Sequence, residues 1–342
     1  MADRIARMAV IGLGTWGQNH CTAYADYHRS RLALVCDLDE ARAREAAQRF
    51  GCDYTARVED VAANPEVDAV AIATPDFAHL EPALAVLRAG KHMIIEKPLA
   101  TDLDEARQIV EARRAAAVKG MTDFQNRWRP HYATIKRAIE RGRLGDPVSG
   151  YAWLSDAVQV ATAWLPWAAR SGPHWFLMCH TMDLVRWFYA REPVEVYATA
   201  YKGVLAERGI DTYDCVQALV RFQGGASCVF DSSWIIPDSS PNVIASGLFL
   251  QGTRGHLQYE ANGQELRLAD ADRFGYPGQS RRNPFGRLDN PFYEPMRHFV
   301  DCVLDDAEPA ASLEDGYAVT AMLCATVQSI ESGKPVPIEP VP

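Results

Sequence analysis

Apolar runs and helical patterns alternate along the first part of the chain. Short apolar runs at residues 8–11, 32–35, 67–73 and 92–95 are typical of buried strands. Amphipathic patterns predict helices at residues 16–28, 40–50, 77–89 and 103–119. This alternation requires right-handed crossovers and gives a parallel sheet covered on both faces. We therefore predict a doubly wound α/β domain over residues 1–123.

The pattern changes after residue 123. Strands are predicted at residues 148–153, 194–201, 213–222, 226–236 and 247–251, with a Gln223-Gly224-Gly225 hairpin turn between the third and fourth. Helices are predicted at residues 130–141, 292–304 and 314–332, and an extended tail at residues 334–342. Because the strands follow one another without intervening helices, residues 124–342 are expected to form an α+β domain with an antiparallel sheet.

Composition and charge narrow the function to small-molecule chemistry. The chain has 342 residues, 48% of them hydrophobic and 23% charged, which fits a globular protein of two domains. A formal net charge of -9 without a basic run argues against a nucleic-acid partner. The N-terminal apolar run is too short for a signal peptide or membrane span, and the eight cysteines form no C-x-x-C pair. We expect reduced thiols and a cytoplasmic protein.

A glycine-rich segment follows the first predicted strand. Gly12-Leu13-Gly14-Thr15-Trp16-Gly17 fits the pattern G-x-G-x-x-G and opens a helix, so that Gly12, Gly14, Thr15, Trp16 and Gly17 are expected at a dinucleotide pyrophosphate. Asp37 lies twenty residues after Gly17, at the end of the second strand, where a carboxylate can accept hydrogen bonds from ribose hydroxyls. Leu38 follows it, and the first arginine after it is Arg42. The segment therefore predicts NAD rather than NADP.

Further motifs resemble those of the Gfo/Idh/MocA oxidoreductases, the glucose–fructose oxidoreductase and inositol dehydrogenase family. They are Thr74-Pro75-Asp76-Phe77-Ala78-His79, Ala89-Gly90-Lys91-His92, Glu96-Lys97-Pro98-Leu99-Ala100, Gln125-Asn126-Arg127 and His180-Thr181-Met182-Asp183. The resemblance implies an N-terminal Rossmann domain and a C-terminal, mostly antiparallel sheet that supports homo-oligomerisation. It implies NAD-dependent hydride transfer at a secondary hydroxyl or ketone of a sugar, sugar derivative or cyclitol. By the same resemblance, Thr74, Pro75, His79, Glu96 and Lys97 are expected to contact the cofactor.

Lys97 and His180 are the predicted catalytic residues, and both are also expected to contact the substrate. Lys97 follows the strand at residues 92–95, at the carboxyl edge where α/β folds bind ligands, and Pro98 favours an extended conformation at Lys97. Among nine histidines, His180 matches the family pattern, and an imidazole suits proton transfer near neutral pH. We expect Lys97 to polarise the carbinol oxygen and His180 to accept its proton.

The chain departs from the family pattern next to His180. Most relatives carry D-x-G-x-H-x-x-D, whereas this chain has Phe176 and Met178 at the first aspartate and the glycine. One member of the usual Lys/Asp/His trio is therefore missing. Asp156 and His174 are candidates to replace it, and Asp183 is a candidate to orient the imidazole.

The predicted substrate side is aromatic and basic. Trp164, Trp167 and Trp175 precede His180, and aromatic platforms suit the apolar faces of sugar rings. Of these, Trp164 is expected to contact the substrate. Arg127, Arg170 and the Arg281-Arg282 pair are candidates to bind a carboxylate or phosphate.

Two other functions are compatible with the sequence. Some members of the family are NAD-dependent, redox-assisted glycosidases, and others are regulators that bind NAD without catalysis; Phe176 is compatible with both. No metal site is expected, since no H-E-x-x-H spacing occurs and His174 and His180 do not share a helical face. A serine hydrolase is disfavoured because no G-x-S-x-G turn occurs.

Overall fold

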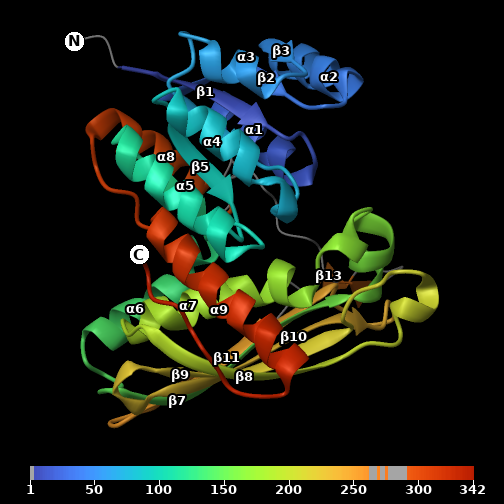
Figure 1. Cartoon of the computed structure of the whole chain (residues 1–342), viewed down its shortest axis with the longest axis vertical. Coiled ribbons are helices and arrows are strands. Elements are labelled where there is room, and N and C mark those ends of the chain that lie inside the picture. Colours follow the sequence, from blue (N-terminus) through green and yellow to red (C-terminus); the bar gives the residue numbers. More distant parts are fainter. Residues whose placement is uncertain (1–3, 262–267, 270–273, 276–290) are drawn as a thin grey trace.

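Two β-sheets, joined by helices, make up the computed structural model (Figure 1). The structure describes residues 4–261, 268–269, 274–275 and 291–342. The candidate pair Arg281 and Arg282 lies outside the described residues. Among the described helices, none combines the length and apolar character needed to cross a membrane.

The first sheet is parallel and has six strands in the order β3-β2-β1-β4-β5-β6. The strands are β1 (Ala6–Ile11), β2 (Ser30–Cys36), β3 (Asp53–Thr55), β4 (Ala69–Ile72), β5 (His92–Glu96) and β6 (Gly120–Asp123). Strand order reverses between β1 and β4, and in such sheets ligands bind beyond the carboxyl ends of the strands at that point. The glycine-rich turn follows β1, Thr74-Pro75 follows β4, and Lys97 follows β5, so all three motifs lie at this edge.

Helices cover both faces of this sheet, as the alternating pattern predicts. They are α1 (Thr15–Asp26), α2 (Glu40–Phe50), α3 (Val58–Ala63), α4 (Leu80–Arg88) and α5 (Leu103–Ala116). Asp39 and Asp102 cap α2 and α5 by accepting hydrogen bonds from backbone N–H groups of the first turn. Gly51 ends α2 in the left-handed conformation that glycine adopts without a Cβ clash.

The second sheet has seven strands in the order β12-β11-β7-β10-β9-β8-β15. They are β7 (Pro147–Ala157), β8 (Pro193–Tyr201), β9 (Cys215–Phe222), β10 (Ser227–Ile236), β11 (Ile244–Gly252), β12 (His256–Glu260) and β15 (Val336–Pro337). All neighbouring pairs are antiparallel except β7 and β10, which are parallel. The predicted hairpin at Gln223–Gly225 is confirmed between β9 and β10. A further pair, β13 (Leu268–Ala269) and β14 (Phe274–Gly275), is antiparallel.

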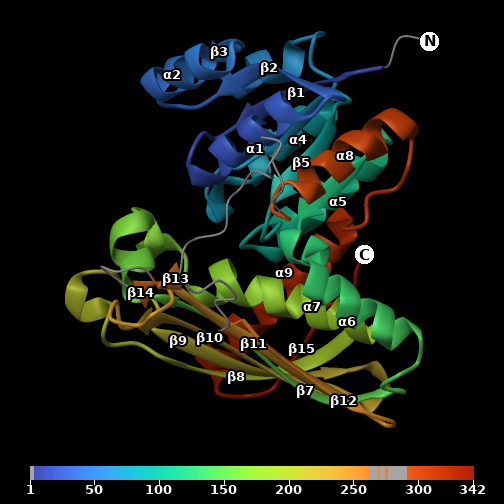
Figure 2. The ribbon, with the colours of Figure 1, turned by 180° about the vertical axis from the view of Figure 1, so that it is seen from behind.

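Four more helices follow the first sheet in the chain: α6 (Pro130–Glu140), α7 (Cys179–Tyr189), α8 (Glu294–Asp305) and α9 (Leu313–Ser332). Figures 1 and 2 show α6, α7 and α9 on one face of the second sheet. Helix α9 packs against β8, α7 and α5, and α8 packs against α1 and the first sheet. The C-terminal helices therefore contact both halves of the molecule.

Candidate cofactor and active site

The glycine turn after β1 is shaped by close backbone contacts. Gly12 has φ +86°, and a Cβ there would lie 2.7 Å from the carbonyl oxygen of Ala73, whereas a Cβ on Gly17 would overlap the carbonyl of Gly12. Around Gly14, apart from its neighbours in the chain, no atom of the described residues lies within 4 Å of a Cβ position. Gly14 is also the N-cap of α1 and has no side-chain cap. The turn thus presents free N–H groups and open space, as a dinucleotide pyrophosphate requires.

Asp37 lies beside this turn at the end of β2. Its carboxylate accepts hydrogen bonds from the backbone N–H of Leu13 at 2.8 Å and of Asp39 at 2.9 Å. The guanidinium of Arg42 lies 3.2 Å from it and is half exposed. These bonds fix the carboxylate next to the cofactor turn, where the sequence predicts a ribose.

His79 ties together the segments that follow β4 and β5. Its buried ring lies between two carbonyl oxygens, 3.2 Å from that of Leu99 and 3.1 Å from that of Thr74. Burial lowers the pKa of His79, whereas the two carbonyl contacts oppose this shift. The predicted cofactor residues Thr74, Pro75 and Lys97 are thereby held at neighbouring strand ends.

Lys97 points from the end of β5 toward the segment that precedes α7. It is 6% exposed, and its ammonium donates a hydrogen bond of 3.1 Å to the carbonyl of Phe176, in the helical turn η5 (His174–Met178). The ammonium also lies 4.2 Å from the centre of the Phe176 ring. Within the described ranges no carboxylate forms an ion pair with it. Burying an ammonium without an anion costs free energy, and such groups occur preferentially at functional sites.

His180 lies in the first turn of α7, one helical turn beyond Phe176. It is 8% exposed, and its Nδ1 has no hydrogen-bond partner among the described atoms. Burial lowers its pKa well below the usual value, and the charges of Lys97 and Arg129 add to this effect. A neutral imidazole with a free nitrogen near Lys97 is suited to exchanging a proton with a ligand.

Asp156, near the end of β7, is a second unpartnered group, and the charge of Lys97 acts on it. It is 3% exposed, and its Oδ1 has no hydrogen-bond partner in the part of the chain described. Burial raises its pKa to about 7, and the charge of Lys97 opposes the shift. Strand β7 packs against η5, the turn that carries Phe176. A titratable carboxyl is thus present near Lys97, although the sequence position that usually supplies it is Phe176.

His174 and Asp183, the other candidates for a role beside His180, have different surroundings from Asp156. Nδ1 of His174 is also unpartnered, and burial lowers the pKa of this imidazole to about 3. Asp183 does not face His180: it receives two hydrogen bonds from the buried guanidinium of Arg127, at 3.0 and 2.5 Å. Arg127 also pairs with Asp315 at 3.1 Å. A substrate would have to compete with these ion pairs for the guanidinium of Arg127, which was predicted to contact it.

The tryptophans before His180 separate into exposed and packed ones. Trp164, in the turn η3 (Val160–Trp164), is 57% exposed. Trp167 packs edge-on against both Phe77 and Phe176, with ring centres 6.2 and 6.0 Å away. The guanidinium of Arg170 stacks 3.5 Å from the centre of the Phe77 ring. Trp167 therefore contacts the residues that line the Lys97 site, whereas Trp164 lies at the surface.

Comparisons with known proteins agree with this layout. Residues 6–124 match a model of an oxidoreductase family with an NAD-binding Rossmann fold, and residues 132–258 match the GFO/IDH/MocA C-terminal domain. The inositol 2-dehydrogenase of Rhizobium meliloti is 26% identical over 337 residues, or 97% of this chain and 99% of that protein. The D-apiose dehydrogenase of Paraburkholderia graminis is 26% identical, covering 97% of this chain and 89% of that protein.

A solved structure shares the whole architecture. The scyllo-inositol dehydrogenase of Lactobacillus casei, determined with bound NAD(H) and scyllo-inositol, superposes with a TM-score of 0.84. The match covers 98% of this chain and 99% of that one, at 20% identity. Similarity at this level shows the fold.

Proposed function

The chain belongs to the Gfo/Idh/MocA family of oxidoreductases, and on that premise we propose that it is an NAD-dependent dehydrogenase of a sugar, sugar derivative or cyclitol. The observation that carries this proposal is the buried ammonium of Lys97. It lies at the cofactor edge of the first sheet without an anionic partner in the described structure, with the unpartnered His180 nearby.

Each residue of this site has a separate role in the oxidation of a secondary alcohol. The ammonium of Lys97 donates a hydrogen bond to the carbinol oxygen and stabilises the negative charge that develops there. His180, neutral at pH 7, accepts the hydroxyl proton, and Asp156 in its ionised form lowers the cost of the resulting imidazolium. NAD, when bound, accepts the hydride from the same carbon. The products are a ketone, NADH and one proton.

The preference for NAD over NADP rests on Asp37. Its carboxylate is held by two backbone N–H groups, and a 2′-phosphate there would meet a fixed negative charge. Arg42 is already paired with that carboxylate. We expect kcat/KM with NAD to exceed that with NADP by at least about tenfold, roughly 1.4 kcal/mol.

The substrate class follows from the site and from the names of the relatives. Inositol and apiose, after which the relatives above are named, are a cyclitol and a sugar, and both carry several hydroxyl groups. Unpartnered polar atoms on Asp156, His174 and His180 offer hydrogen bonds to several hydroxyl groups, and Trp167 with Phe77 borders the same region. These features support a polyhydroxylated ring as the substrate.

Two further properties belong to the proposal. The face of the second sheet opposite α7 and α9 carries exposed apolar side chains, among them Tyr151, Tyr197, Tyr201 and Leu219, which supports a homo-oligomer formed through this sheet. The eight cysteines are all unpaired, which supports a cytoplasmic location.

A substrate panel tests the function directly. The full-length protein is incubated with NAD and, separately, with inositols, aldoses, sugar acids and glycosides, and NADH and glycoside cleavage are both measured. Net NADH formation supports the dehydrogenase. Cleavage of a glycoside without net NADH would instead identify the redox-assisted glycosidase, and NAD binding without either reaction would identify a regulator.

A further inference from the structure

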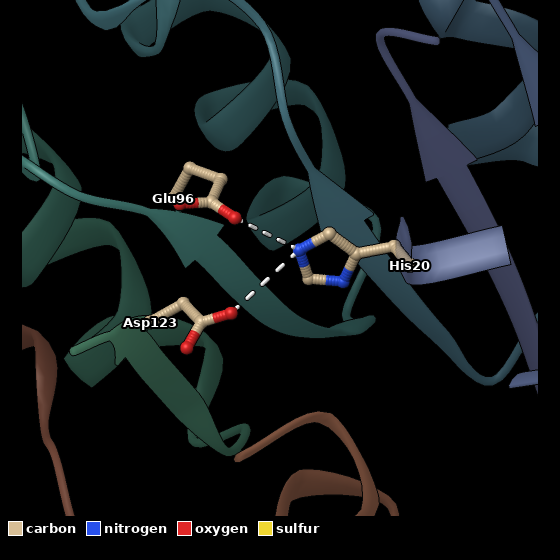
Figure 3. Close-up of side chains that lie close together, drawn as sticks. All are labelled: His20, Glu96 and Asp123. Atoms are coloured by element: carbon tan, nitrogen blue, oxygen red, sulfur yellow. Dashed lines mark hydrogen bonds and ion pairs between the residues drawn. The ribbon is translucent and has the colours of Figure 1, made fainter. Parts of the chain in front are cut away.

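Three buried side chains that can ligate a metal meet near the cofactor edge of the first sheet, apart from Lys97, His180 and Asp156 (Figure 3). They are His20 on α1, Glu96 at the end of β5 and Asp123 at the end of β6. One of them, Glu96, is also a predicted cofactor contact. All three are at most 5% exposed. We propose that this cluster binds a divalent transition-metal cation such as Zn²⁺ and holds these three elements together.

The separations between the side chains suit one cation. Nε2 of His20 lies 3.2 Å from Oε1 of Glu96 and 3.7 Å from Oδ2 of Asp123. Ligand atoms from the three residues all lie within 4.8 Å of one another. Two ligands of a tetrahedral zinc ion, each about 2.0–2.1 Å from the metal, lie roughly 3.3 Å apart. Small side-chain movements therefore bring the three atoms onto one ion, and a water molecule completes four ligands.

The second nitrogen of His20 is already held as in a metal-bound histidine. Nδ1 lies 3.1 Å from the hydroxyl of Tyr24, which is itself buried. When Nδ1 donates to this oxygen, the lone pair of Nε2 faces the two carboxylates. Metal-ligating histidines nearly always have such a partner for the nitrogen that does not bind the metal.

Asp123 is the observation that points to a ligand. Its side chain is 1% exposed and makes no hydrogen bond among the described residues; Oδ1 is unpartnered, and Oδ2 faces His20 beyond hydrogen-bond distance. Buried charges are normally paired or bound to metal. A divalent cation balances the two carboxylates, and a nitrogen with two carboxylate oxygens suits Zn²⁺ better than Ca²⁺ or Mg²⁺.

The cation would couple the cofactor turn to the catalytic lysine. Helix α1 begins at the glycine turn, and Glu96 directly precedes Lys97. One ion bridging α1, β5 and β6 would stabilise this edge of the sheet. This role is independent of the proposed function, because it concerns binding and stability rather than turnover.

Metal analysis and calorimetry test the site. The full-length protein is purified without chelator for elemental analysis, then treated with EDTA, dialysed and titrated with Zn²⁺ alone by calorimetry and thermal unfolding. We expect one zinc per chain, a higher Tm with zinc, and no such response to Ca²⁺ or Mg²⁺. Absence of metal after purification together with absence of binding in the titration would overturn the proposal.

Two matched variants distinguish zinc binding at this cluster from zinc binding elsewhere on the protein. D123N keeps the shape of the side chain and removes one ligand, so it should fold but bind zinc at least about tenfold more weakly. D156N changes another buried carboxyl that lies outside the cluster, and its zinc binding should equal that of the parent. Equal zinc affinity and Tm shift in D123N and the parent would contradict the assignment.

Discussion

At the scale of single residues, the proposed active site lacks the carboxylate that the family pattern has at the position of Phe176, and another buried carboxyl, that of Asp156, lies near Lys97. Phe176 lies against Lys97 where a carboxylate is usual, and its ring contributes only a cation–π contact. A phenyl ring cannot hold a proton, so in the proposed mechanism His180 and Asp156 carry the proton exchange. Lys97 and His180 were predictable from motif spacing. Asp156 was one of several candidates. Its charge interaction with Lys97 and a pKa that burial raises to about 7, which only the structure shows, distinguish it from His174, whose pKa is lowered to about 3.

D156N tests the role of this carboxyl through pH. Burial raises the pKa of Asp156 to about 7, so Asp156 becomes ionised only as the pH passes that value. We expect kcat of the parent for alcohol oxidation to rise between about pH 6 and 8, and D156N to lose this rise along with roughly 10²-fold in kcat. A pH–rate profile measures both. An unchanged profile in D156N would remove Asp156 from the mechanism.

D156N, which should lower activity, should raise the stability of the folded protein at neutral and higher pH. The pKa of Asp156 is higher in the folded state than in the unfolded chain, so the folded state binds more protons and stability falls as the pH rises from about 4 to 7. Asparagine is neutral throughout. The Tm of D156N should therefore exceed that of the parent by more at pH 8 than at pH 4.5; an equal difference at both pH values would contradict the raised pKa.

At the scale of secondary-structure elements, periodicity predicts the long elements and misses the short ones. The predicted helix at residues 77–89 is interrupted in the structure: a 3-10 turn spans Asp76–Ala78 and α4 begins at Leu80. Strand β6 was not predicted, because four residues that include a glycine and an aspartate give no apolar run. β7 extends beyond its predicted end at residue 153 to Ala157. Asp123 and Asp156 lie on these unpredicted segments, so their placement required the structure.

The glycine turn gives a matched pair of variants at this scale. In G17A the new Cβ overlaps the backbone of Gly12, so both Tm and NAD binding should fall. In G14A the Cβ enters open space, so Tm should change little while NAD affinity falls at least about tenfold through a clash with the pyrophosphate. Thermal unfolding and NAD titration distinguish the two. Undiminished NAD affinity in G14A would place the cofactor elsewhere.

At the scale of the whole molecule, buried ion pairs join segments that are distant in sequence. Arg127 precedes α6 and pairs with Asp183 on α7 and Asp315 on α9; Arg186 also pairs with Asp315, at 2.6 Å. Burial raises the pKa of Asp183 to about 6 although Arg127 opposes the shift, so the carboxyl is mostly ionised at pH 7. The two-sheet architecture was predictable from strand order along the chain. The network of buried ion pairs was not predictable, because the spacing of residues in the sequence does not show which distant charges pair.

R127M tests whether this arginine supports the fold or the substrate. Leaving Asp183 buried without its partner should lower the free energy of unfolding by about 3–5 kcal/mol. R127M/D183N removes both charges and should recover part of that loss, together with the KM of the parent, as measured by denaturant unfolding and steady-state kinetics. A double variant that regains stability but keeps a raised KM would show that Arg127 contacts the substrate.

In the proposed function, the buried ammonium of Lys97 promotes hydride transfer to NAD. The most direct measurement is the single-turnover rate of NADH formation in the parent and in K97M, with the best substrate of the panel and with NAD binding measured in parallel. We expect K97M to bind NAD but to transfer hydride about 10²–10³-fold more slowly, because the developing charge on the carbinol oxygen loses its donor. A K97M enzyme that binds NAD and turns over as fast as the parent would contradict it.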